Sequence, residues 1–64
     1  MNTTLDAQQI KKAIAEQENL IARIEVELVA ATPDHKPEIR GRLRVARNYL
    51  AHLDFQLEME RELA

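Results

Sequence analysis

The stretch that decides the fold reads VARNYLAHLDFQLEMEREL and covers residues 45–63. It carries two apolar rows, although a two-helix hairpin needs only one on each helix. The first row alternates spacings of four and three residues, which is typical of helices that pack as a coiled coil. This row, the hairpin seam, begins before the stretch and comprises Ile39, Leu43, Ala46, Leu50, Leu53 and Leu57. It predicts a second helix over residues 37–63 that packs against another helix along its length.

A second row lies beside the hairpin seam and repeats with the same spacing. This outer row consists of Val45, Tyr49, His52, Gln56, Met59 and Leu63, with Phe55 at its edge. A hairpin buries one stripe of each helix, so the outer row is expected to face water in a single chain. A contiguous exposed apolar row indicates an interaction surface. We therefore predict that the outer row and Leu20, which flanks the seam of the first helix, form a dimer or partner interface.

A simpler interpretation of the outer row remains open. Met59 and Leu63 would then belong to a frayed helix end, and Tyr49 would be an ordinary aromatic residue at the rim of a core. We interpret His52 as an interface side chain rather than a metal ligand, because no matching His, Cys or carboxylate stands at helical spacing from it. We expect neither a metal site nor a cofactor.

The first helix is expected over residues 4–31, with Thr3 as its N-cap and Asp6 in its first turn. Its part of the seam repeats the same spacing and comprises Ile10, Ile14, Gln17, Ile21, Ile24, Leu28 and Ala31. Gln17 is the one polar member of this set. It is either a partly exposed or self-satisfied side chain, or a polar residue that sets the register, as buried polar residues can in coiled coils.

The turn between the helices is expected over residues 32–36. Pro33 disfavours helical geometry in the residue before it, and Pro37 suits the first position of a new helix. So short a connection makes the helices antiparallel neighbours, with His35 as a solvated loop residue. The predicted fold of residues 1–64 is therefore all-α, a single antiparallel two-helix hairpin with coiled-coil-like packing, which we expect to dimerise into a four-helix bundle.

Charged residues that played no part in defining the seams test this register. With the turn at Pro33, the seam layers run from Leu28 beside Ile39 to Ile10 beside Leu57. The flanking residues then form four pairs of opposite sign, Glu25 with Arg40, Glu18 with Arg47, Lys11 with Asp54, and Glu27 with Arg42. Such exposed pairs stabilise a fold only slightly, but they are good indicators of register.

Four arginines crowd the start of the second helix, namely Arg40, Arg42, Arg44 and Arg47. They suggest an anion or nucleic-acid surface, but the register gives three of them acidic partners and leaves only Arg44 without one. No aromatic residue lies inside the cluster to stack on bases. We therefore favour structural pairing, with RNA or nucleotide binding as the alternative. Gly41 costs about 1 kcal/mol here relative to Ala and marks either a fraying helix start or a close backbone approach.

Composition excludes several classes of function. The 64-residue chain has no cysteine, no serine and a net charge of −2, which leaves no disulfide, no thiolate metal site and no global attraction to nucleic acid. No apolar run is long enough for a membrane span, and no signal peptide is recognisable. We expect a cytoplasmic protein without membrane contacts. Because no phosphate loop, carboxylate pair or activated nucleophile is found, we do not expect an enzyme.

The predicted function is a non-catalytic protein-interaction module, a small inhibitor, regulator, adaptor or chaperone that binds a protein partner through its apolar helical face. The layout resembles that of co-chaperones of bacterial secretion systems and of small phage- or plasmid-encoded regulators, a resemblance of architecture rather than of motif. The alternative is a dimeric RNA- or nucleotide-binding hairpin. Plasmid copy-number regulators that bind paired RNA loops are similar to this chain in size and layout.

Overall fold

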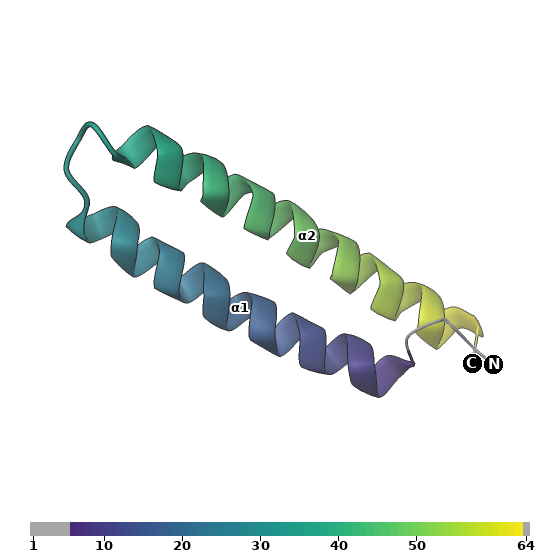
Figure 1. Cartoon of the computed structure of the whole chain (residues 1–64). Coiled ribbons are helices and arrows are strands. Elements are labelled where there is room, and N and C mark those ends of the chain that lie inside the picture. Colours follow the sequence, from purple (N-terminus) through teal and green to yellow (C-terminus); the bar gives the residue numbers. More distant parts are fainter. Residues whose placement is uncertain (1–5, 64) are drawn as a thin grey trace.

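Two long helices run antiparallel and pack side by side along their length (Figure 1). The computed structural model describes residues 6–63, and the side chains of residues 6–62. Helix α1 covers Ala7–Ala30 and helix α2 covers Lys36–Leu63. The predicted all-α hairpin is therefore confirmed.

Helix α1 begins later than predicted. Asp6 is its N-cap instead of a first-turn residue, and the predicted cap Thr3 lies outside the described residues. The backbone N–H of Gln9 donates to Oδ1 of Asp6 at 2.9 Å, and the backbone N–H of Asp6 donates to Oε1 of Gln9 at 3.1 Å. This reciprocal capping box satisfies two donors at the helix start, which explains why the helix begins at Ala7 rather than at residue 4.

The turn is held by the carbonyl oxygen of Thr32. It accepts hydrogen bonds from the backbone N–H of His35 at 3.0 Å and of Lys36 at 3.2 Å. Helix α2 starts at Lys36, one residue before the predicted boundary. Pro37 fits in this first turn because its missing N–H would have no partner there. His35 is exposed as predicted, and its Nδ1 lies 2.9 Å from the Thr32 hydroxyl.

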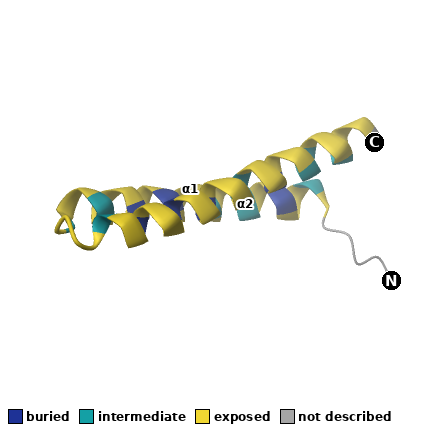
Figure 2. Ribbon diagram, turned by 90° about the horizontal axis from the view of Figure 1, so that it is seen from above, coloured by how far each residue is buried: buried dark blue, intermediate teal, exposed yellow. Residues whose placement is uncertain are grey.

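The core is the predicted seam, whose buried members recur along the helices as dark blue segments among exposed yellow ones (Figure 2). Its buried members are Ile10, Ile21, Ile24, Ile39, Leu43, Ala46 and Leu53. Leu53 is the most enclosed of them, at 1% exposure. The other seam residues are half-buried, including Gln17 and Glu60, at which the seam of α2 loses its apolar character. A single row of side chains thus forms the core.

Only part of the predicted charge pairing forms. Arg42 contacts Glu27 at 2.8 Å as predicted, whereas Arg47 contacts Glu25 at 3.0 Å instead of Glu18. Within the described range, the predicted Glu25–Arg40 and Lys11–Asp54 pairs do not come within salt-bridge distance.

The direction of the side chains explains which pairs form. Every Cα–Cβ bond in a helix tilts toward the N-terminus of that helix. In an antiparallel hairpin the two helices point in opposite directions, so side chains on them lean in opposite directions. Two side chains therefore lean toward each other only when each residue lies a little closer to the C-terminus of its own helix than the position directly opposite its partner. Arg42 and Glu27 meet this condition, as do Arg47 and Glu25. In the three predicted pairs that do not form, each residue lies toward the N-terminus of its own helix from the position opposite its partner, so the side chains lean apart. These pairs are Glu25–Arg40, Glu18–Arg47 and Lys11–Asp54.

Candidate interaction surface

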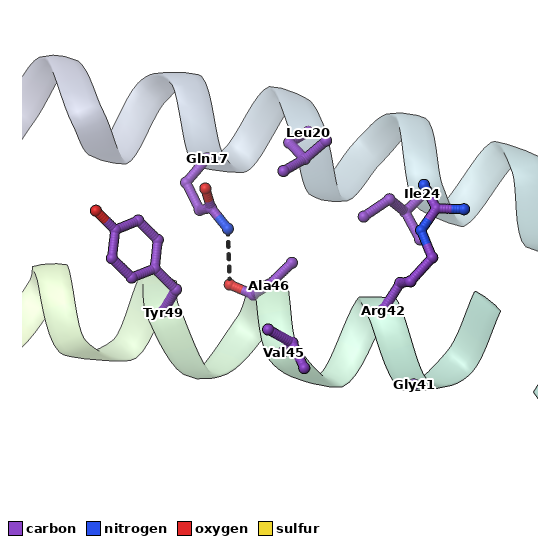
Figure 3. A pocket seen from close by; sticks show the side chains of 8 residues that line it. All are labelled: Gln17, Leu20, Ile24, Gly41, Arg42, Val45, Ala46 and Tyr49. Carbon is purple, nitrogen blue, oxygen red and sulfur yellow. Dashed lines mark hydrogen bonds between the residues drawn. The ribbon is translucent and has the colours of Figure 1, made fainter. Parts of the chain in front are cut away.

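One side of the hairpin is hollowed by a groove of about 500 Å³ between the two helices. Figure 3 labels the eight residues that line it, which are Gln17, Leu20, Ile24, Gly41, Arg42, Val45, Ala46 and Tyr49. Buried Ile24 and Ala46 belong to the core, whereas Leu20, Val45 and Tyr49 are exposed by 37%, 69% and 51%. The groove is therefore an opening in the hairpin through which apolar side chains remain accessible to a partner.

The predicted interface residues divide into two groups. Leu20, Val45 and Tyr49 come together at the groove, between α1 and the first half of α2. The rest of the predicted surface lies further along α2, outside the groove. There Phe55 and Met59 are 62% and 41% exposed, His52 is exposed, and Gln56 is half-buried. The side chain of the remaining member, Leu63, lies outside the described side chains.

Gln17 connects the two helices beside the groove. Its Nε2 donates to the carbonyl oxygen of Ala46 at 3.0 Å, as the dashed line in Figure 3 shows. The amide is therefore neither self-satisfied nor simply solvated. A side-chain donor on one helix that meets a backbone acceptor on the other favours one alignment of the helices, which supports the interpretation that Gln17 sets the register.

Gly41 lines the groove at the turn end. It lies inside α2 without positive φ, so its backbone does not require glycine. A Cβ added there would meet nothing within 4 Å, which rules out a close backbone approach inside the described part of the hairpin. Sequence reasoning did not connect Gly41 with the interface, although it stands four residues before Val45 on the same side of the helix.

The arginine cluster is only partly neutralised. Arg42 and Arg47 hold acidic partners, but Arg40 and Arg44 have no carboxylate within salt-bridge distance among the described residues. The prediction that three of the four arginines are paired is therefore wrong, because Arg47 takes the carboxylate of Glu25 that was assigned to Arg40. The two observed pairs are about half exposed, and such pairs are typically worth less than about 1 kcal/mol each.

The remaining surface offers little further chemistry. A second groove of about 390 Å³ lies at the turn end, where Thr32 and His35 form part of its wall. Residues 6–63 contain no cluster of His, Cys, Asp or Glu that could hold a metal ion. Neither described helix is apolar over a stretch long enough to cross a membrane. The sequence matches no protein-family model, and comparisons with curated proteins and with solved structures give no match.

Proposed function

We propose that this chain is a non-catalytic protein-interaction module that works as a homodimer, in which two hairpins form a four-helix bundle. The observation that carries the proposal is the exposed apolar side of α2. Val45 and Tyr49 face solvent at a groove that also exposes Leu20, and Met59 is exposed further along the same helix. A single hairpin covers only one stripe of each helix, and a second hairpin laid over this side would bury the rest.

The surface area of the chain supports the same proposal. The chain exposes 5208 Å², whereas a compact monomer of 7.4 kDa would expose about 4,200 Å². The total counts all 64 residues, so the share that the helix faces supply is smaller than this difference. A second hairpin laid over the open side of α2 would cover part of this excess surface.

As such a module, the protein would act as a small regulator, inhibitor or adaptor that offers to another protein the part of its apolar helical side that the dimer leaves uncovered. Helix-in-groove recognition requires a row of anchor positions on one face and a groove that receives them. This chain supplies the groove, which Leu20, Val45 and Tyr49 line beside Gly41, and the partner would supply the helix with the anchors. No covalent step is needed for this kind of function.

Sedimentation of matched variants tests the proposal. Tyr49→Ala combined with Met59→Ala removes two exposed anchors and should give the mass of a single chain, while the unmodified protein sediments as a dimer. Val26→Ala combined with Val29→Ala is the control, because these valines are 71% and 83% exposed but lie on other sides of α1. A dimer that survives the first double substitution, or is lost with the second, would refute the proposed interface.

A second candidate function rests on the two unpaired arginines. Arg40 and Arg44 stand four residues apart on one side of α2 without acidic partners in the described chain, and could contact phosphates of RNA or of a nucleotide. In that case Arg44→Glu should abolish an RNA affinity that falls steeply with salt. RNA binding that is absent, or unchanged in this variant, would exclude the second candidate.

A further inference from the structure

The charges of α2 are divided between its two halves. Residues 36–47 hold five basic and one acidic residue, a net charge of +4, whereas residues 52–63 hold four acidic and one basic residue, a net charge of −3. The charges of α1 and the turn, which lie beside the basic half of α2, do not cancel this difference. Residues 18–47, which include the turn and the facing part of α1, hold six basic and five acidic residues and keep a net charge of +1. Each hairpin is therefore positive toward its turn and negative toward its open end.

We infer that two copies of this chain pair through α2 in antiparallel orientation, about a two-fold axis beside His52. This inference rests on the proposed homodimer and specifies its geometry. With the axis at His52, residues 41–47 of each α2 lie along residues 57–63 of the other. The first segment holds three arginines and the second holds three glutamates and one arginine, and the match occurs twice. Parallel pairing would place like charges together at both ends, which disfavours that arrangement.

The apolar side chains are complementary in the same arrangement. Val45 and Met59 each stand seven residues from His52, and Tyr49 and Phe55 each stand three residues from it. A two-fold axis beside His52 therefore sets Val45 level with Met59 of the second copy, and Tyr49 level with Phe55, which stands at the edge of the outer row. In an isologous interface every such contact is made twice. The open space at Gly41 then faces the last turns of α2 of the second copy, beyond its Met59.

Arg44 gains an acidic partner in this arrangement. It has no carboxylate within salt-bridge distance in the described part of its own hairpin. In the antiparallel dimer it lies nearly level with Glu62 of the second copy. Each of the two residues lies slightly toward the C-terminus of its own helix from the position opposite its partner, as in the Arg42–Glu27 and Arg47–Glu25 pairs. The two side chains therefore lean toward each other. The rule that selects the ion pairs inside the hairpin thus also selects a pair between hairpins.

Disulfide trapping tests this geometry directly, because the chain contains no cysteine. Under mild oxidation, His52→Cys should crosslink to itself. Val45→Cys should crosslink with Met59→Cys when the two variants are mixed, and only weakly to itself. Efficient self-crosslinking of Val45→Cys would instead show a parallel dimer and overturn the inference, although the proposed homodimer would stand. Absence of all crosslinks in a protein that sediments as a dimer would place the interface elsewhere.

Charge exchange provides an independent readout. Arg44→Glu should raise the dissociation constant of the dimer on the order of tenfold, because two exposed pairs are lost at once. Glu62→Arg should have a similar effect, and the chain that carries both substitutions should recover most of the affinity. If the double variant is no tighter than either single variant, the Arg44–Glu62 contact is refuted. If all variants sediment as single chains together with the unmodified protein, the proposed function itself fails.

Discussion

Replacement of Gly41 by alanine should affect the stability of the hairpin and the packing of a second copy differently, so the two effects can be measured apart. The residue lies inside α2 without positive φ, and an added Cβ meets nothing within 4 Å. Inside a helix, glycine is less favourable than alanine by about 1 kcal/mol, because it loses more backbone freedom on folding. Gly41→Ala should therefore stabilise the isolated hairpin by nearly the full amount.

The effect is measured best where association does not contribute. We would introduce Gly41→Ala into the monomeric Tyr49→Ala, Met59→Ala background and follow thermal unfolding by circular dichroism. A gain of about 1 kcal/mol in a chain of this size corresponds to a rise in Tm of about 4–8 °C. The same substitution in the unmodified sequence is the comparison, because there a partner helix would lie over the groove and the new methyl group would crowd it.

Two results would refute this reasoning. A lower Tm in the monomeric background would show that the groove beside Gly41 is not open in the folded chain. An equal gain in both backgrounds, with an unchanged dissociation constant, would show that nothing packs against Gly41 and that the groove is not part of the interface.

Three further predictions concern the hairpin itself. Leu53→Ala should lower the free energy of unfolding by about 2–5 kcal/mol, because the side chain is 1% exposed and leaves a cavity; urea unfolding that shows no loss would contradict the buried seam. Gln17→Ala should cost about 1 kcal/mol through the lost bond to the Ala46 carbonyl, and an equal loss in Gln17→Asn, whose amide is too short to reach, would attribute the effect to that bond. A double-mutant cycle on Arg42 and Glu27 should give a coupling below about 1 kcal/mol that weakens with salt, whereas a larger, salt-independent value would contradict a half-exposed pair.

The helices and their contact could be predicted from the sequence because a strict spacing of four and three residues leaves few other folds. The buried residues of the core, from Ile10 to Leu53, are those that this spacing selects. The turn was also predictable within one residue, since Pro33 and Pro37 restrict the backbone on both sides of it.

Three features could not be read from the spacing alone. The start of α1 is set by the capping box between Asp6 and Gln9, which the spacing of apolar residues does not reveal. The ion pairs depend on side-chain direction, which a list of facing positions omits; adding the tilt of the Cα–Cβ bond would have selected Glu25 for Arg47. The groove depends on how the two helices pack, and Gly41 is one of its lining residues, beside which nothing lies within 4 Å of an added Cβ.

The most direct test of the central claim is the mass of the unmodified protein in solution. Interfaces of standard size bind with dissociation constants from micromolar to picomolar, so light scattering at about 100 μM should detect any of them. Our account predicts twice the 7.4 kDa mass of the chain, with dissociation only on dilution. A mass of one chain at this concentration would contradict the claim that the apolar side of α2 binds a second copy.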